Sequence, residues 1–348
     1  MSNYLFIFIW ACCLIPFIKK PSWPTAFIVT LPLLYIVATR GWVADTILYR
    51  YNYINKVPSS IDELSWYMST QGKDKAFYFV TALIKIFITT NPDIYFGIIA
   101  GFQIIALVFL FKKYSIDFSI SFYLFIASTD YFSWMFNGIR QFTAVCIIIL
   151  ATPFFIKKKY LQSILIIVIA SMFHKSALLM IPLIFIANGK AWNKKTIIFI
   201  LLSVLAIIFV DQFTTLLQEG LEETQYRNVV SDYTNGGDNG TNPIRVLVYS
   251  VPAIISFIYR NKIRKKDDTV INFCTNMSII TSGIYLVSMV TSGIFIGRLP
   301  IYTSLYSYIL LPWETEELFD NNKFIYLGMI LAYAVFYYFQ MHVVWRRF

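Results

Sequence analysis

The sequence predicts an all-α, polytopic integral membrane protein, and two features of its composition lead to this class. Of the 348 residues, 58% are hydrophobic and only 14% are charged, whereas soluble domains carry about 25% charged residues. Apolar runs long enough to cross a bilayer recur along the whole length. We therefore expect a single transmembrane helical domain over residues 1–348, with about 11–13 transmembrane or half-spanning helices.

The apolar runs give the expected elements in order. Nine candidate spans lie at residues 4–18, 23–39, 94–111, 116–136, 139–156, 196–210, 244–259, 270–297 and 324–345. Two further runs, 76–90 and 299–312, each hold about 15 residues where about 20 are needed to cross. We interpret these two as re-entrant or half-spanning segments.

Charge predicts how the chain is oriented. The net charge of +10 comes largely from short clusters of basic residues between apolar runs, which typically lie in the cytoplasm. These clusters are Lys19-Lys20, Lys112-Lys113, Lys157–Lys159, Lys190–Lys195 and Arg260–Lys266. The loops at about 40–75 and 211–245 and the stretch 314–320 then lie outside, and Arg346-Arg347 lies inside. No segment interleaves basic and aromatic residues on a soluble surface, so we expect no nucleic-acid partner.

The run from Tyr160 to Ile186 is interrupted by a polar patch at His174-Lys175-Ser176. Since basic clusters flank the run on both sides, a hairpin satisfies the charge rule, and one long tilted helix is the alternative. Each arm of the hairpin has only about 13 residues, roughly 20 Å, so His174 would lie at the floor of a pocket open to the outside. A neutral imidazole there can accept a hydroxyl proton, although a lone histidine also serves as a hydrogen bonder between helices.

Three polar residues open the span near residue 139. Asn137, Arg140 and Gln141 have the i, i+3, i+4 spacing that places them on one helix face. The planar donors of arginine suit carboxylate or phosphate oxygens. The alternative is an arginine that reaches the lipid headgroups, with the amides joining neighbouring helices.

Two other outer segments hold candidate residues. Arg298 ends an apolar span and precedes Tyr302, a pair that suits an anionic, sugar-bearing ligand or, alternatively, an aromatic belt with one anchoring arginine. In the first outer loop, Asp45 and Tyr49 would share a helix face, and Asp45 could act as a base or orient a sugar. The alternative is a carboxylate paired with Arg40 or Arg50.

Several signatures of other functions are absent from the sequence. There is no P-loop, HExxH or GxSxG motif, and the four cysteines, at positions 12, 13, 146 and 274, have no metal-binding spacing. Intramembrane carboxylates are nearly absent, which disfavours ion-driven transport. We expect no metal and no cofactor.

Taken together, four motifs resemble the EpsG family of bacterial polysaccharide polymerases, which is related to Wzy-type O-antigen polymerases. They are Arg40…Asp45…Tyr49, Asn137-Gly-Ile-Arg140-Gln141, Phe173-His174-Lys-Ser-Ala-Leu178 and Arg298…Tyr302…Pro312. The chain departs from the family in the stretch before the apolar run 76–90. The family typically carries an acidic residue with a glycine there, whereas this chain reads Gly72-Lys-Asp-Lys-Ala-Phe77.

The resemblance implies a membrane glycosyltransferase with a GT-C-like fold in the bacterial inner membrane. Its substrate would be an oligosaccharide linked to undecaprenyl pyrophosphate, and its site would face the periplasm or outside. A chain-length regulator protein is a further candidate partner, beside the membrane lipid. His174, Arg140, Arg298 and Asp45 would be catalytic, whereas Asn137, Gln141, Tyr302, Arg40 and Tyr49 would bind substrate. A membrane acyltransferase and a lipid-linked oligosaccharide flippase or other transporter are the alternatives.

Overall fold

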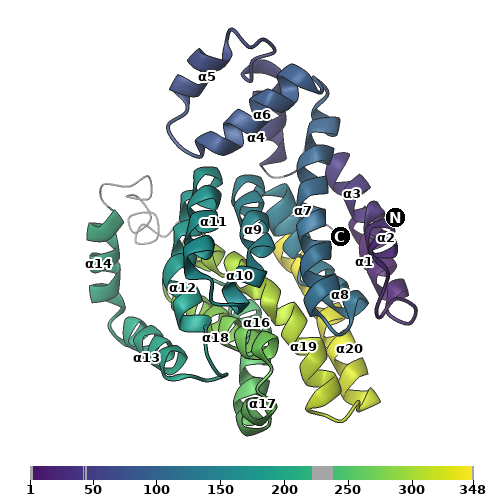
Figure 1. Ribbon diagram of the computed structural model, residues 1–348, viewed down its shortest axis with the longest axis vertical. Helices are drawn as coiled ribbons and strands as arrows, with labels where there is room; N and C mark the ends of the chain where they lie inside the picture. The colour runs from purple at the N-terminus through teal and green to yellow at the C-terminus, as the bar shows by residue number, and fades with distance from the viewer. Residues whose placement is uncertain (1–2, 42, 44, 222–237, 347–348) are drawn as a thin grey trace. The chain divides into compact units, whose positions relative to one another are not determined.

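The computed structural model describes residues 3–41, 43, 45–221 and 238–346, and every regular element within these ranges is helical (Figure 1). The chain divides into two compact units, Met1–Leu179 with Asn321–Phe348, and Met180–Asp320. We call them unit 1 and unit 2 and describe each by itself. The prediction of an all-α polytopic membrane protein is confirmed, and the assignment of one domain stays a prediction.

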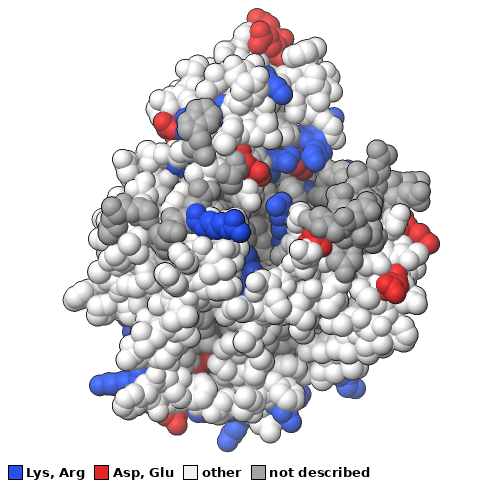
Figure 2. Space-filling model, turned by 180° about the vertical axis from the view of Figure 1, so that it is seen from behind, with Lys and Arg blue, Asp and Glu red and all other residues white. Residues whose placement is uncertain are grey.

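Three described helices are long and apolar enough to cross a membrane alone, namely Pro92–Tyr114, Thr269–Met289 and Lys323–Val344. Two bent helix pairs, Lys194–Ile208 with Val210–Gly220 and Pro243–Ile258 with Arg260–Lys266, raise this number to five if each pair forms one span. Further apolar helices are shorter, with 10–17 residues. Most of the surface drawn in Figure 2 is uncharged, as expected of a protein whose surroundings are hydrocarbon.

Unit 1 is built around α8 (Phe118–Ala127), all ten residues of which are buried. Helices α1 (Asn3–Leu14), α7 (Pro92–Tyr114) and α20 (Lys323–Phe339) pack against it. The remaining elements of the unit are α2 (Trp23–Ile28), α3 (Leu31–Ala38), α4 (Thr46–Asn55), α5 (Leu64–Thr70), α6 (Lys75–Phe87), the π-helix η1 (Tyr131–Phe136), α9 (Ile139–Leu150), α10 (Thr152–Ile156), α11 (Tyr160–Phe173), the 3₁₀-helix η2 (Lys175–Leu179) and the π-helix η5 (Gln340–Val344).

The two ends of unit 1 differ in charge. At one end the carbonyl of Lys19 accepts a hydrogen bond from the backbone of Phe118, and the ammonium of Lys112 lies 5.2 Å from the centre of the Trp23 ring. The first two basic clusters therefore lie at the same end, as predicted. At the other end the aromatic ring of Tyr4 packs 5.2 Å from that of Phe132 in η1. We call this the η1 end.

Helix α6 does not cross the bundle, as the short run 76–90 predicted. With α4 and α5 it forms a group at the end of unit 1 where α7 begins (Figure 1). The buried ammonium of Lys85 donates to the carbonyls of Tyr53, Ile54 and Val57 at 2.6, 3.0 and 2.7 Å. These carbonyls lie at the end of α4, where backbone acceptors lack partners within the helix and where the helix dipole favours a cation. Lys85 thereby holds α6 against α4.

Unit 2 is built around α18 (Thr269–Met289), which is almost fully buried. It contacts α12 (Met180–Ala187), α13 (Lys194–Ile208), α16 (Pro243–Ile258) and α19 (Ser307–Glu317), together with the 3₁₀-helices η3 (Ile296–Tyr302) and η4 (Ser304–Tyr306). The helices α14 (Val210–Leu221) and α17 (Arg260–Lys266) complete the unit. Asparagine or aspartate side chains cap the first turns of α13, α16 and α18, and so satisfy backbone donors that each helix leaves unpaired.

The predicted half-span before Pro312 is wrong. The chain from η3 to α19 runs along α18, with Thr303 bonded to Thr281 at 2.7 Å and Ser307 bonded to Ser278 at 3.2 Å. Ten 3₁₀ residues at about 2.0 Å and eleven α-helical residues at about 1.5 Å give about 36 Å, enough for a hydrocarbon core of about 30 Å. The helical segment is long enough because it extends past the short apolar run 299–312 at both ends, from Ile296 to Glu317.

The predicted sides of the acidic stretch and of the C-terminus are therefore also wrong. Lys262 lies 3.4 Å from the carboxylate of Asp320, and Lys266 lies 2.8 Å from that of Glu317, so the acidic stretch shares the end of the basic helix α17. In unit 1, the indole of Trp345 donates to Thr129, next to η1. The segment before Arg346 thus ends at the η1 end, opposite the basic end, while Arg347 lies outside the described residues.

This corrected topology predicts a labelling pattern. In a variant without its native cysteines, Asp320→Cys and Lys265→Cys should both be protected from a membrane-impermeant maleimide added to right-side-out vesicles. Ile294→Cys, an exposed position at the other end of α18, should be labelled. If Asp320→Cys is labelled together with Ile294→Cys, the acidic stretch lies outside, and the prediction of a half-span before Pro312 is correct.

Candidate functional site

Arg140 is the centre of a polar cluster in unit 1. It is the second residue of α9, which begins directly after Gly138. Its Nε donates to the hydroxyl of Tyr49 at 3.0 Å, and its Nη1 donates to the carboxylate of Asp74 at 2.7 Å and to the hydroxyl of Tyr78 at 3.2 Å. The Arg140 side chain is still 22% exposed. These bonds leave the two N–H groups of Nη2 without a hydrogen-bond partner among the described residues, so the guanidinium is oriented but retains donors for a ligand.

Asp74 brings a buried negative charge to this arginine. It stands directly before α6 with a left-handed backbone (φ 53°), a conformation that aspartate tolerates better than most residues. Its carboxylate is only 1% exposed. Burial raises the pKa of the Asp74 carboxyl, while Arg140 and the backbone of Lys175 oppose that rise. The pair therefore joins α6 to α9 and to the loop that follows α11.

That loop carries His174 into the same cluster. Helix α11 ends at His174, whose backbone is extended (φ −159°, ψ 119°), so the run 160–186 is not one continuous helix. The Nδ1 atom of His174 lies 2.7 Å from the hydroxyl of Ser176. The same hydroxyl accepts a hydrogen bond of 3.3 Å from the amide of Gln141. A chain of hydrogen bonds thus connects the residue after Arg140 to the imidazole.

The segment that we predicted to be the first outer loop joins the cluster through α4. Asp45 directly precedes this helix, and its backbone N–H donates to the side-chain oxygen of Asn137 at 3.4 Å. One helical turn later, Tyr49 reaches Arg140. The structure therefore brings together the predicted residues Arg140, Gln141, Asn137, His174, Tyr49 and Asp45. Their individual roles toward a substrate stay predictions.

Arg40 lies deeper and contacts the protein instead of the surface. It is 3% exposed and donates to the carbonyl of Met135 in η1. Its guanidinium lies 4.2 Å from the centre of the Phe96 ring and 5.3 Å from that of Phe136. A cation over aromatic faces stabilises packing between α3, α7 and η1. This burial favours a structural role for Arg40 over the direct substrate contact that we predicted.

Unit 2 holds the other predicted residues, Arg298 and Tyr302. Both lie in η3, where three residues per turn separate positions i and i+4 by about 120°. The two side chains accordingly do not share one face, because Arg298 is exposed and Tyr302 is 2% exposed. Within the part of the chain that the structure describes, the guanidinium of Arg298 has no hydrogen-bond or ion-pair partner. A site shared by Arg298 and Arg140 stays a prediction.

The segment before Arg298 is held by Asp238, which sequence reasoning missed. Its carboxylate accepts hydrogen bonds from the hydroxyl of Ser292 at 2.6 Å and from the backbone N–H groups of Ile294, Gly293 and Gly240 at 2.9, 3.0 and 3.1 Å. Burial raises the pKa of Asp238, but these four bonds outweigh it and hold the pKa below its ordinary value.

Close backbone packing reinforces this contact. The backbone of Thr241 donates to the carbonyl of Ser288, whose hydroxyl donates back to the side chain of Thr241. A Cβ at Gly297 would lie 2.4 Å from the Thr241 hydroxyl, and a Cβ at Gly240 (φ 75°) would lie 2.4 Å from the carbonyl of Met289. Only glycine permits these approaches. We call residues 238–241 with 288–297 the outer knot.

Asp74, Tyr78 and Asp238 are the residues of these sites that the sequence did not single out. Asp74 had a visible signal, since it is the acidic residue at the point where the chain departs from the family pattern. Within the described ranges no group of three or more His, Cys, Asp or Glu residues could hold a metal ion. The chemistry that the described clusters offer is cationic hydrogen bonding and an imidazole.

Fold and site together define a polytopic helical membrane protein with an arginine-centred polar site. The chain matches the model of the EpsG family over residues 25–346 and belongs to this family, which includes Wzy-like polymerases. No curated protein and no solved structure matches the chain.

The outer knot predicts a pH-dependent stability. Because the folded pKa of Asp238 is lowered, its ionised form stabilises the fold fully above the unfolded pKa of about 3.9, and this contribution is lost as pH falls through the folded pKa. Asp238→Asn should cost about 1–3 kcal/mol at pH 7. In thermal unfolding scans, the difference in Tm between Asp238→Asn and the wild type should shrink below about pH 4.

The matched control is Asp211→Asn, because Asp211 is exposed on α14 and should show no such difference. A pH-independent deficit in Asp238→Asn would mean that the carboxylate charge is not what holds the knot.

Proposed function

We propose that this chain is a bacterial polysaccharide polymerase. It transfers a glycan from an undecaprenyl-pyrophosphate carrier to the non-reducing end of another lipid-linked repeat unit, at the outer face of the inner membrane. The observation that carries the proposal is the orientation of Arg140, whose side chain is fixed by Asp74, Tyr49 and Tyr78 and keeps unused donors. Membership of the EpsG family supports the reaction class.

The leaving group explains why an oriented arginine matters. When the bond between the anomeric carbon and the pyrophosphate oxygen breaks, negative charge grows on the pyrophosphate. Donors that are already positioned for that charge stabilise the transition state without reorganising. Arg140 supplies such donors, and its second position in α9 adds the positive end of the helix dipole. We assign the same kind of role to Arg298, which is exposed and has no hydrogen-bond or ion-pair partner among the residues that the structure describes.

The acceptor hydroxyl must lose its proton as its oxygen attacks the anomeric carbon. We assign this proton to Nε2 of His174, with Nδ1–H donating to Ser176. Gln141 holds that serine from the other side, so the imidazole keeps one orientation. Asp45 is the second candidate base. The proton moves from the acceptor hydroxyl to the imidazole, and the pyrophosphate leaves on its lipid carrier.

Substitution of the three assigned residues should stop polymerisation at the first unit. We expect Arg140→Ala and Arg298→Ala to lower the rate about 10²–10³-fold and His174→Ala about 10²–10⁴-fold. Gel analysis of cell glycans should then show single lipid-linked units without a ladder of longer chains. Arg140→Lys should be nearly as poor as Arg140→Ala, because one ammonium cannot replace donors in three directions.

Arg260→Ala is the control, since this exposed arginine lies in the basic helix α17 and its loss should leave the ladder intact. A normal ladder in all three site variants would refute the assignment. Full activity of Arg140→Lys would instead indicate an arginine that only anchors the helix to headgroups.

The serine beside His174 gives a finer test. Ser176→Ala should lower kcat about 3- to 10-fold, the equivalent of one hydrogen bond of about 1 kcal/mol, with little change in KM. Ser176→Thr keeps the hydroxyl and should restore most of the rate. The measurement is polymerisation in vitro with a defined lipid-pyrophosphate repeat unit. Equal losses in the alanine and threonine variants would show that Ser176 matters for packing, not for the imidazole.

A further inference from the structure

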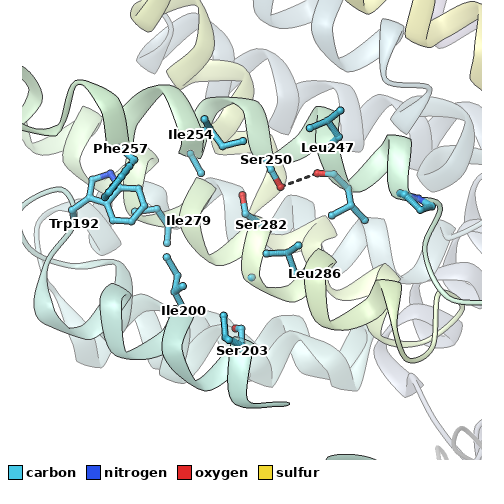
Figure 3. A pocket seen from close by; sticks show the side chains of 15 residues that line it. Trp192, Ile200, Ser203, Leu247, Ser250, Ile254, Phe257, Ile279, Ser282 and Leu286 are labelled. Atoms are coloured by element: carbon cyan, nitrogen blue, oxygen red, sulfur yellow. Dashed lines mark hydrogen bonds between the residues drawn. The ribbon is translucent and has the colours of Figure 1, made fainter. Parts of the chain in front are cut away.

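Unit 2 contains an apolar groove between α13, α16 and α18 (Figure 3). Its volume is about 560 Å³, within the range of about 300–1,000 Å³ that is usual for ligand pockets. Trp192 and Phe257 lie at one end, and Leu247 and Leu286 lie toward the other. The groove therefore follows the length of α16 and has the elongated form that a chain-like ligand needs.

The hydroxyl groups in the groove do not make it polar. Ser203, Ser250 and Ser282 line it, and each donates to the carbonyl of the residue four positions earlier in its own helix, at 2.8–3.0 Å. Their donors are already used, so the groove offers little to a polar ligand. Since these side chains are also small, they leave the space that larger residues would fill.

The open side of the groove faces the apolar surface of unit 2. Leu247 and Ile254 on its rim are 61% and 49% exposed. Neighbouring positions on α13, such as Leu201, are exposed as well. A membrane protein exposes such side chains to hydrocarbon, so the groove opens sideways into the bilayer.

One end of the groove leads to the outer knot. Pro243 and Leu286 line that end, and each is two residues from the hydrogen-bonded pair Thr241 and Ser288. Thr241 packs against Gly297, the residue before Arg298. An exposed cation thus directly follows the segment that is bonded next to this end of the groove, and its donors favour a lipid whose headgroup carries the dense negative charge of a pyrophosphate.

We propose that the groove binds the polyprenyl tail of a lipid pyrophosphate whose headgroup is bound by Arg298. This inference rests on the proposed function, because it assigns the carrier lipid to a particular place in unit 2. The apolar groove provides affinity for the tail in proportion to the area it buries. The outer knot, through Asp238, sets the position of the arginine relative to the mouth of the groove.

Photolabelling tests the proposal without any turnover. The full chain in nanodiscs is incubated with geranylgeranyl pyrophosphate that carries a diazirine in its tail. We expect crosslinked peptides from α13, α16 and α18, and competition by unlabelled undecaprenyl pyrophosphate but not by excess phosphatidylglycerol. Competition by both lipids alike would mean that the groove holds ordinary bilayer acyl chains, and crosslinks only elsewhere in the chain would place the tail outside it.

A variant in which a larger side chain fills the groove is compared with a control variant that carries the same side chain outside it. Ser250→Phe should reduce labelling at least 10-fold, whereas Leu201→Phe adds the same ring on the exposed face of α13 and should leave labelling unchanged. Thermal unfolding checks that both variants fold, and Ser250→Leu is the smaller replacement if phenylalanine prevents folding. Equal labelling of the filled and control variants would overturn the proposal.

Two further measurements distinguish failure of this inference from failure of the proposed function. Arg298→Ala should weaken binding of geranylgeranyl pyrophosphate about 10-fold but not binding of geranylgeraniol, which has the same tail without the charge. If labelling follows this pattern while His174→Ala still forms polymer, the proposed function fails and the groove assignment stands. If polymerisation behaves as proposed while Ser250→Phe labels normally, only the groove assignment fails.

Discussion

The ion pair between Arg140 and Asp74 is the interaction on which the polar part of unit 1 depends. Taking a carboxylate and a guanidinium out of water costs several kcal/mol per ion, and only good geometry with additional hydrogen bonds offsets that cost. Here Tyr49 and Tyr78 supply the additional bonds, so α4, α6 and α9 must meet at one point, and Lys85 holds α6 against α4. Apolar side chains of similar volume often give equal stability, so stability alone does not account for a charged pair at this position.

The same requirement, that polar groups removed from water find partners, organises unit 2. Asn276 on the buried helix α18 donates to the carbonyl of Ala187 at 2.8 Å and accepts from the backbone of Trp192 at 3.1 Å. The neighbouring Asn272 accepts from the backbone of Ala191. These amides form hydrogen bonds with backbone groups of the turn between α12 and α13. The outer knot does the same for backbone groups of the loop before α16. Both contacts lie at ends of the apolar groove, so polar contacts define its length while small side chains define its width.

Sequence reasoning succeeded where a local pattern determines the outcome. The i, i+3, i+4 spacing from Asn137 to Gln141 and the polar interruption at His174 are local features, and the structure brings both into one cluster. It failed for Asp74, because nothing local shows that a residue in a left-handed turn contacts an arginine 66 positions away. It also failed for the acidic stretch 314–320, because hydropathy does not show that helix α19 continues beyond the apolar run 299–312 as far as Glu317.

The sequence by itself therefore determined that this is a helical membrane protein, with basic clusters between its apolar runs. It also determined the chemistry of the candidate residues, which are arginines and a histidine at helix ends. Composition and hydropathy are sums over neighbouring residues, and these properties depend on such sums. Only the tertiary structure decided which carboxylate orients Arg140, which aspartate holds the segment of Arg298, and where an apolar groove is left open. These depend on contacts between distant segments, whose partners are selected by the cost of burying unpaired charge and by the space that small side chains leave.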